Sequence, residues 1–341
     1  MTMVTENARH FKLGASALFL ATIALVASCS NSAAPSPDPT RPIVVSAVDF
    51  ELPVVGDGAS KLPTTVMSAD DIEVTVTDTS RIIVLNEAIA EIVISLGFID
   101  KIIGRDATTT IESLTAVPKV SSGHDISAES ILELRPTLVI GDTRSGPPEA
   151  IQQLRGAGLA IVLAPEVWRL ADIQPRIDLI SKALGAQDFG KKLTDKTNSD
   201  IDQALSTLAD GEIAPRVAFV YVRGTASVFL LGGEESGADE MIRSAGGVDV
   251  GTDMGLAAFT PLTSEAIVKA NPDIIVVTTR GLASVGGLTG LLDLPGVAQT
   301  PAAKNNAVVS VDDDLLFSFG PRTGELIVRM ANAFKMLATK N

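Results

Sequence analysis

Reactive side chains are scarce in this sequence of 341 residues, which contains one Cys, two His, one Tyr and one Trp. A single cysteine excludes an intrachain disulfide framework, a thiol redox pair and a cysteine-rich zinc site. Basic residues are also few, because 27 Lys and Arg stand against 41 Asp and Glu, for a net charge of −14. Such a chain offers no basic surface that could neutralise phosphates, which argues against nucleic-acid binding.

Apolar material, by contrast, is plentiful. Hydrophobic residues make up 46% of the sequence, and a domain typically takes about 150 residues. The length and composition therefore predict roughly two domains, each with a packed core.

The first 28 residues are predicted to be a targeting segment. Arg9 and Lys12 precede an apolar run over 13–26, which is shorter than the about 20 residues of a membrane span. The run ends in VASC at 26–29, which resembles the lipobox of bacterial lipoproteins, whose cysteine carries the lipid after cleavage. The resemblance implies lipidation of Cys29 and a location on the extracytoplasmic face of the membrane. The alternative is a plain secretory peptide with an incidental cysteine.

Residues 29–70 are predicted to contain a flexible tether followed by a segment of uncertain structure. Residues 30–39 are rich in Ser, Ala and Pro and lack hydrophobic periodicity, which is typical of a linker. Residues 41–70 contain strand-like fragments, such as 43–45, that are interrupted by Gly and Pro.

Strands and helices alternate through the rest of the chain. Residues 71–168 form one α/β series, residues 169–210 are mostly helical with a break at Gly185, and residues 211–341 form a second series. The predicted fold class is α/β, with two Rossmann-like lobes of parallel-rich sheets joined by one long connecting helix. The predicted strands include 82–85, 102–104, 138–140 and 160–163 in the first lobe and 217–222, 229–231 and 274–277 in the second.

An internal sequence repeat, which we call the internal echo, indicates that the two lobes are related. Segment 127–140 aligns at an offset of 136 with segment 263–276, and each contains a capping residue, an early Glu, a short helix, a proline and an apolar strand. The early Glu is Glu129 in one copy and Glu265 in the other. Coincidence between two ordinary helix–strand units is the alternative.

With these features the chain resembles the helical-backbone substrate-binding proteins of ABC importers, which capture iron–siderophores, cobalamin or haem. The resemblance rests on the lipobox, the two lobes with one connecting helix, and the sequence AESILELRPTLVI at 128–140, and it covers about residues 70–341. It implies a monomeric binding protein rather than an enzyme, with a ligand cleft between the lobes. The implied partners are an ABC permease and its ATPase subunit.

The same resemblance assigns a role to the two echoed carboxylates. In that family one Glu on each lobe docks onto Arg residues of the permease, and the matching residues here are Glu129 and Glu265. An exposed carboxylate on each lobe provides a two-point electrostatic register. The alternative for each is a solvated residue at the start of a helix.

The only tyrosine, Tyr221, and the only histidine beyond the targeting segment, His124, are the candidate ligand-binding residues. Tyr221 and Arg223 lie two residues apart in a predicted strand and therefore share a face near its carboxyl end, which faces the ligand crevice in open α/β sheets. A guanidinium beside a phenol favours the phenolate, a hard anionic ligand suited to ferric iron. His124 lies in the loop before the helix that carries Glu129.

This arrangement resembles the haem-binding lipoproteins of actinobacterial haem importers. In those proteins a His from one lobe and a Tyr from the other are the axial ligands of the iron, and a Tyr-x-Arg motif places the Arg against the phenolate oxygen. The resemblance implies that His124 and Tyr221 ligate ferric haem and that Arg223 supports Tyr221. The alternatives are a surface histidine with a packing tyrosine, a ferric siderophore or cobalamin as ligand of the same fold, and an exported hydrolase.

Two further segments carry no recognisable functional motif, and several residues are only general candidates for lining a haem pocket. The Gly-rich run 281–290 lacks the ending of a phosphate-binding loop and is expected to be a loop, and the acidic run 312–314 lacks calcium-loop spacing and is expected to be a turn. The apolar walls of a haem pocket would come from Leu, Val and Ile side chains or from Met254, Phe259 or Phe317. The candidates for propionate partners are Arg105, Arg144, Arg280 and Arg322.

Overall fold

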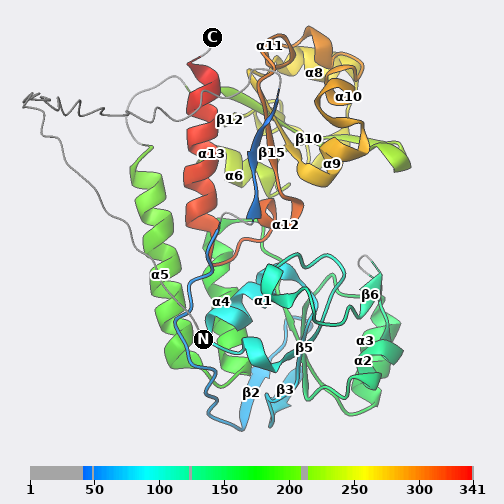
Figure 1. Cartoon of the computed structure of the whole chain (residues 1–341), viewed down its shortest axis with the longest axis vertical. Helices are drawn as coiled ribbons and strands as arrows, with labels where there is room; N and C mark the ends of the chain where they lie inside the picture. The colour runs from blue at the N-terminus through cyan, green and yellow to red at the C-terminus, as the bar shows by residue number, and fades with distance from the viewer. Residues whose placement is uncertain (1–40, 48–49, 123–124, 209–213, 340–341) are drawn as a thin grey trace, which may run out of the picture. The chain divides into compact units, whose positions relative to one another are not determined.

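The computed structural model describes residues 41–47, 50–122, 125–208 and 214–339. The targeting segment, Cys29, the tether up to residue 40 and His124 lie outside these residues. Residues 37–341 form one compact unit, and the expected pair of α/β lobes is present within it (Figure 1). Among the described residues, no helix is both long and apolar enough to span a bilayer.

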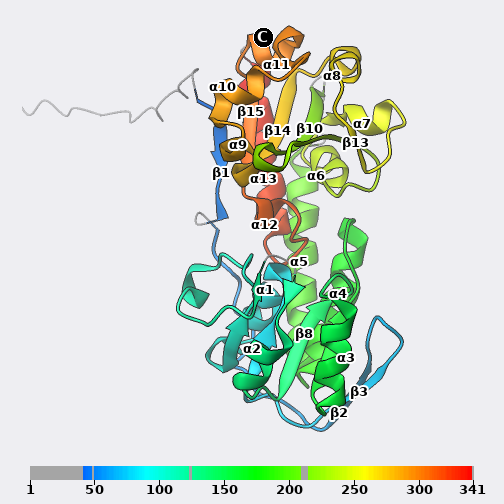
Figure 2. The same cartoon turned by 90° about the vertical axis from the view of Figure 1, so that its right-hand side faces the viewer.

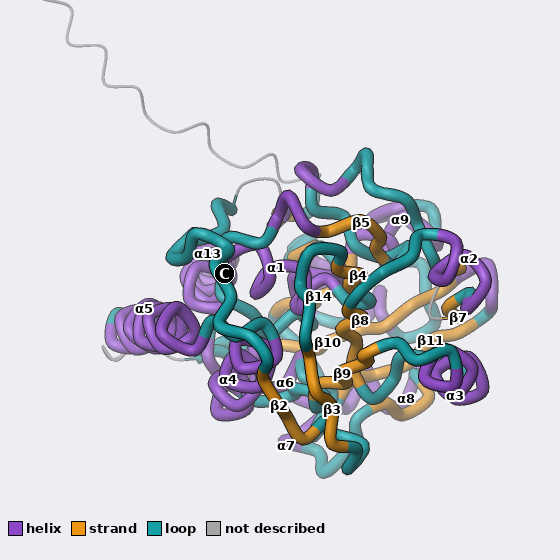
Figure 3. The backbone as a smooth tube through the Cα atoms, turned by 90° about the horizontal axis from the view of Figure 1, so that it is seen from below, coloured by secondary structure: helices purple, strands orange, loops and turns teal. Residues whose placement is uncertain are grey.

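The N-terminal lobe is built on a parallel sheet with strand order β5-β4-β8-β9. Its strands are short apolar runs buried on both faces, as expected where helices cover a parallel sheet on each side. The strands are β4 (Ile82–Val84), β5 (Ile102–Arg105), β8 (Leu138–Asp142) and β9 (Ala160–Ala164). Helices α1 (Glu87–Ser95) and α4 (Ile173–Ala183) cover one face, and α2 (Ala128–Glu133) and α3 (Pro148–Gly156) cover the other (Figure 3).

Two antiparallel pairs and three single-turn helices complete this lobe. The pairs are β2 (Thr64–Met67) with β3 (Glu73–Val76), and β6 (Ser121–Ser122) with β7 (Asp125–Ile126). The 3-10 helices are η2 (Ile99–Lys101), η3 (Glu112–Leu114) and η4 (Leu170–Asp172).

The C-terminal lobe is built on a mixed sheet with strand order β1-β15-β14-β10-β11-β13, and β12 also pairs with β10. β1, β15, β14 and β10 run parallel, whereas β11 and β13 are antiparallel to their neighbours. The strands are β1 (Ile43–Val45), β10 (Arg216–Arg223), β11 (Val228–Gly232), β12 (Val248–Asp249), β13 (Phe259–Pro261), β14 (Ile274–Thr278) and β15 (Val308–Val311).

Helices cover both faces of this second sheet and form two separate apolar cores. On one face lie α6 (Ala238–Ser244) and α13 (Thr323–Ala338), and on the other lie α7 (Val250–Asp253), α8 (Ser264–Ala270), α9 (Thr279–Ser284), α10 (Gly287–Leu292) and α11 (Pro301–Lys304). The remaining elements are α12 (Asp313–Leu316), η5 (Gly224–Ala226) and η6 (Val297–Gln299).

The connecting helix is α5 (Gln187–Ser206), which packs against α4 and lies beside α13 (Figure 2). The break predicted at Gly185 is present, because α4 ends at Ala183 and α5 begins at Gln187. Gly185 has a φ of +64°, a left-handed conformation that costs glycine little and side-chain-bearing residues more. In the sequence, α5 stands between the N-terminal lobe and β10 of the C-terminal lobe.

Three segments differ from the sequence-based expectation. The segment of uncertain structure supplies β1, which lies beside β15 in the C-terminal lobe (Figure 1). The Gly-rich run is not a loop but lies in α9 and α10, and the Thr278 side chain caps α9 by accepting a hydrogen bond from Gly281 N. The acidic run is not a simple turn, because Asp313 and Asp314 begin α12.

Candidate functional site

Tyr221 and Arg223 lie together near the carboxyl end of β10. Arg223 Nε donates a hydrogen bond to Tyr221 Oη, and the guanidinium carbon lies 5.3 Å from the centroid of the phenol ring. Tyr221 is half-buried and Arg223 is exposed. The strand therefore presents a phenol oxygen that already has a cationic donor, at the end of the sheet where α/β proteins bind ligands.

The short strands β6 and β7, on either side of residues 123–124 in the sequence, are described, whereas Gly123 and His124 are not. β6 and β7 pair in the register Ser121 with Ile126 and Ser122 with Asp125. Ile126 N also donates a hydrogen bond of 2.7 Å to Gly146 O, which attaches this pair of strands to the loop between β8 and α3. The structure thus brings Tyr221 and Arg223 together, while the role of His124 stays a prediction.

Glu129 and Glu265 occupy equivalent positions in the two lobes. Each is the second residue of its helix and is exposed, and the helices are capped by Ser127 and Thr263, whose hydroxyl oxygens each accept a backbone hydrogen bond of 3.1 Å. Capping of this kind favours a helix start at these positions. The structure places one exposed carboxylate on each lobe, and their docking role stays a prediction.

The internal echo extends to the backbone where each helix ends. Arg135 follows α2 with a φ of 46°, and Asn271 follows α8 with a φ of 47°. Both residues precede a proline and a parallel strand, β8 or β14. Two side-chain-bearing residues with the same unusual backbone at aligned positions favour related lobes over coincidence.

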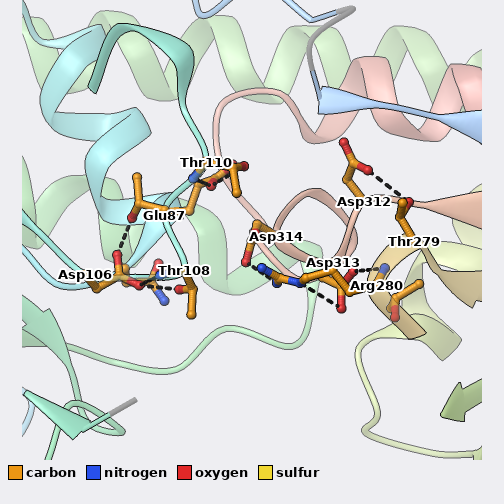
Figure 4. A network of polar contacts seen from close by, with 12 residues as sticks. Glu87, Asp106, Thr108, Thr110, Thr279, Arg280, Asp312, Asp313 and Asp314 are labelled. Carbon is orange, nitrogen blue, oxygen red and sulfur yellow. Dashed lines mark hydrogen bonds and ion pairs between the residues drawn. The ribbon is translucent and has the colours of Figure 1, made fainter. Parts of the chain in front are cut away.

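A cavity of about 570 Å³ lies between the lobes, and both polar groups and apolar side chains, such as Phe50, Leu52 and Ile111, line it. Figure 4 shows Glu87 and Thr110 on the side of the N-terminal lobe and Arg280 with its acidic partners on the other. The residues that line it do not include Tyr221 or Arg223. This cavity and the Tyr221–Arg223 pair are therefore separate features of the described structure.

The acidic run 312–314 lines this cavity and has internal partners. The Asp312 carboxylate accepts hydrogen bonds from Ala47 N at 2.6 Å and from Thr279 Oγ1 at 2.9 Å. Asp313 and Asp314 both form ion pairs with Arg280 (Figure 4). Burial, together with the Glu87 charge, raises the pKa of Asp314 to about 7. The run ties β1 and α9 to the start of α12.

The structure separates the four arginines considered as propionate partners. Arg105 and Arg322 are buried and donate to groups inside the protein, Arg105 to Leu114 O and Thr109 O and Arg322 to two glutamates of α1. Arg144 and Arg280 are half-exposed. Of the four, Arg144 and Arg280 therefore have the more exposed guanidiniums, and Arg322, although buried, lines the cavity between the lobes together with Arg280.

The three apolar candidates also differ. Phe317 packs edge-on against Phe219, with ring centroids 5.7 Å apart, and Met254 packs against the core on the far face of the sheet. Phe259 is exposed, and its ring lies edge-on to that of Tyr221, with centroids 5.8 Å apart. Phe259 is therefore the candidate that borders the Tyr221–Arg223 pair.

Sequence reasoning missed a buried cluster in which Arg322 contacts Glu87 and Glu91. The glutamates lie on α1, and the arginine precedes α13 near the end of the chain. One signal was present, because Glu91 stands between apolar residues in the middle of α1, and a charged group among buried apolar residues requires a partner. Its partner could not be identified from local sequence.

Comparisons with known proteins were made by sequence and by structure. The family model described as periplasmic binding protein matches residues 82–315. YvrC of Bacillus subtilis (strain 168), named an uncharacterized ABC transporter substrate-binding lipoprotein, is 27% identical over 279 residues, which cover 80% of this chain and 85% of YvrC. A cobalamin-binding protein of Halobacterium salinarum (strain ATCC 29341 / DSM 671 / R1) is 24% identical over 286 residues, covering 82% of this chain and 76% of that protein.

Solved structures of haem-binding proteins share the fold. The heme binding protein HmuT is 34% identical with a TM-score of 0.78, and the match covers 87% of this chain and 99% of HmuT. Apo RhuT, a periplasmic heme-binding protein from Roseiflexus sp. RS-1, is 36% identical with a TM-score of 0.73, covering 76% of this chain and 100% of RhuT. Structures of three single-residue variants of HmuT are also similar. In these variants alanine replaces a histidine, a tyrosine, or the arginine that follows this tyrosine by two positions. Because the family model spans more than half of the sequence, this chain belongs to the periplasmic binding protein family.

Proposed function

We propose that this chain is a membrane-anchored, extracytoplasmic haem-binding protein that delivers haem to an ABC permease. Ferric haem binds in the cleft between the lobes, with His124 and Tyr221 as axial ligands. A lipid on Cys29 anchors the protein, and Glu129 and Glu265 contact the permease. In this role the protein binds and releases a ligand and catalyses no reaction.

The hydrogen bond from Arg223 Nε to Tyr221 Oη is the observation that carries this proposal. A phenol must lose its proton to bind ferric iron well, and a cationic hydrogen-bond donor on its oxygen stabilises the charged form. A partly exposed polar pair such as Tyr221 and Arg223 contributes little to stability. Activation of the tyrosine as a ligand of iron explains the pair better than a contribution to folding does.

The HmuT variants support the same assignment by their spacing. In HmuT the substituted arginine follows the substituted tyrosine by two positions, as Arg223 follows Tyr221. The substituted histidine precedes that tyrosine by 99 positions in HmuT and by 97 positions here, where it is His124. The same three residue types at nearly the same spacing, in a relative that shares the fold at 34% identity, support the assignment of His124, Tyr221 and Arg223.

A second candidate is cobalamin, favoured by the curated relative that is named a cobalamin-binding protein. A corrinoid brings its own central metal and axial group, so its binding would not require a phenolate from the protein. On this alternative, replacing Tyr221 would leave affinity for the physiological ligand nearly unchanged.

Titration of the purified protein with haemin and with cyanocobalamin, followed by absorbance, tests the proposal. The wild type is expected to bind haemin with a distinct Soret band, and Tyr221→Phe and His124→Ala are each expected to change that band. Tyr221→Phe is the matched variant because it removes only the phenol oxygen. An unchanged Soret spectrum in both variants would show that these residues are not the axial ligands. Binding of cyanocobalamin without binding of haemin would establish the second candidate instead.

A further inference from the structure

An apolar surface borders Tyr221 on the outer strands of the C-terminal sheet. The strand register pairs Tyr221 with Leu230 of β11, and Leu230 with Pro261 of β13. Phe259 lies two residues before Pro261 and therefore on the same face of the sheet. We call Leu230, Phe259 and Pro261 the edge platform.

The edge platform lies on the opposite face from the core that packs under these strands. Phe229 and Leu262, which neighbour Leu230 and Pro261 in sequence, pack against that core. Leu230 is half-buried and Pro261 is exposed, whereas Phe259 leaves 40% of its surface open. Among the described residues it is the one exposed aromatic side chain. Covering exposed aromatic area of this kind with a ligand removes it from water and therefore favours binding.

Phe259 also contacts the phenol ring directly. Its ring meets that of Tyr221 at an interplanar angle of 65°, in an edge-on arrangement. Arg223 holds the phenol oxygen from the same strand, so Tyr221 is positioned from two sides. The phenol oxygen and the open surface of Phe259 are neighbours on one face of the sheet.

The shape of a metalloporphyrin explains why a ligating phenol oxygen and the exposed ring of Phe259 would both contact it. When the iron of a planar macrocycle binds an axial oxygen, the ring lies across the end of that bond and spreads sideways over whatever surrounds the ligating side chain. Apolar groups that flank Tyr221 on its own face are thus placed to meet the ring on the tyrosine side.

We propose that the edge platform, and Phe259 above all, is the surface on which the porphyrin ring rests beside Tyr221. The inference rests on the proposed function and deepens it by assigning a second kind of contact. Tyr221 recognises the iron, whereas Phe259 recognises the apolar macrocycle irrespective of its metal. The chemical class that the platform takes is a flat apolar ring.

Metal-free protoporphyrin IX separates the two contacts, because it has the ring and lacks the iron. Its affinity and that of haemin are measured by fluorescence and absorbance titration for the wild type, Phe259→Ala, Phe259→Trp and Tyr221→Phe. Phe259→Ala is expected to weaken both ligands by about tenfold, as loss of buried aromatic area implies. Phe259→Trp keeps an aromatic surface and is expected to retain the affinity for both.

Tyr221→Phe is expected to weaken haemin strongly and to leave metal-free protoporphyrin within about threefold, because the iron is the partner of the phenol oxygen. The Soret maximum of the Phe259→Ala complex with haemin is expected to match the wild type, since the axial ligands are kept. Val268→Ala is the matched control, because Val268 lies on α8 of the same lobe with 39% of its surface exposed. It is expected to bind both ligands as the wild type does.

The outcomes distinguish the inference from the function on which it rests. If haemin binding depends on Tyr221 while Phe259→Ala binds metal-free protoporphyrin as tightly as the wild type, the platform is overturned and the function stands. If the wild type binds neither haemin nor metal-free protoporphyrin, both are overturned. Circular dichroism checks the fold of each variant, and Phe259→Leu replaces Phe259→Ala if the latter unfolds, with a severalfold loss of affinity for both ligands expected.

Discussion

Arg322 and Glu91 form a buried ion pair that joins the two lobes, with Arg322 Nη2 2.5 Å from Glu91 Oε1. The same guanidinium nitrogen lies 3.2 Å from Glu87 Oε1. Arg322 precedes the last helix of the C-terminal lobe, and both glutamates lie on the first helix of the N-terminal lobe. One arginine therefore contacts two carboxylates that the fold has removed from water, and its single positive charge can balance only one of them.

Arg322→Met is expected to lower the free energy of unfolding by about 3–5 kcal/mol, because it leaves buried carboxylates without their counter-charge. Urea denaturation followed by circular dichroism measures the change. Lys191→Met is the control, since Lys191 forms an exposed ion pair with Asp195, and the expected change there is below about 1 kcal/mol. Equal effects of the two substitutions would contradict a stabilising role for the buried cluster.

The contribution of Glu91 to the stability of the protein is expected to fall as the pH rises from about 4.5 to about 7. Burial raises the pKa of Glu91 from 4.5 to about 7, although the Arg322 charge acts in the opposite direction. The folded chain therefore binds more protons than the unfolded chain within this window, so this group stabilises the fold at the acidic end and loses that effect towards neutral pH. The contribution is on the order of 3 kcal/mol.

Glu91→Gln tests this pH dependence, because glutamine has nearly the same shape and does not titrate. Its free energy of unfolding is expected to vary less between pH 5 and pH 7 than that of the wild type. The burial-raised pKa of Asp314 has the same sign, so Asp314→Asn is expected to remove a separate part of the slope. Identical slopes in wild type and Glu91→Gln would show that Glu91 does not titrate in this range.

Arg223→Ala is expected to weaken haem binding by about 10–100-fold, as loss of a hydrogen bond to a charged oxygen implies. The tyrosine–iron bond is also expected to break at a higher pH than in the wild type, because the phenolate has lost a neighbouring cation. Absorbance titration with haemin and acid measures both. Arg216→Ala, at the other end of β10, is the control and should behave as the wild type.

Charge reversal at both docking positions, Glu129→Lys with Glu265→Lys, is expected to abolish haem uptake by cells while leaving haemin binding in solution unchanged. The two carboxylates are exposed and lie on separate lobes, so their loss removes a two-point register without disturbing a core. Glu133→Lys is the control, because Glu133 is exposed at the end of the same helix as Glu129. Normal uptake by the double variant would remove the docking role.

Cys29→Ala is expected to release the protein from the membrane fraction, because the proposed lipid anchor is attached to this cysteine. Fractionation followed by immunoblotting measures the distribution. The same variant should bind haemin as the wild type does. Retention in the membrane after signal cleavage would contradict lipidation at this position.

Much of the fold could be predicted from local patterns. The parallel strands are short apolar runs, and the helices begin at capping residues such as Ser127 and Thr263. The break at Gly185 was readable because a left-handed residue ends a helix without help from distant parts of the chain. The Tyr221–Arg223 contact was predictable for the same reason, since strand periodicity alone puts the two side chains on one face.

Contacts between segments far apart in sequence could not be predicted in this way. Phe259 reaches Tyr221 only because β11 lies between their strands in the sheet, and Arg322 reaches α1 only after both lobes have formed. β1 is equally non-local, since its three residues become a strand by pairing with β15. The Gly-rich run was misjudged as a loop because a capping hydrogen bond and tertiary packing outweigh the low helix propensity of glycine.

The pairing of β1 with β15 also determines how the protein carries mechanical load. The chain enters the C-terminal sheet at Ile43, leaves it to build the whole N-terminal lobe, and then returns to complete the sheet. The N-terminal lobe is thus an insertion within its neighbour. A pull on the chain ahead of residue 41 therefore loads the three-residue ladder between β1 and β15 first, and the force passes into the C-terminal sheet without stretching the inserted lobe.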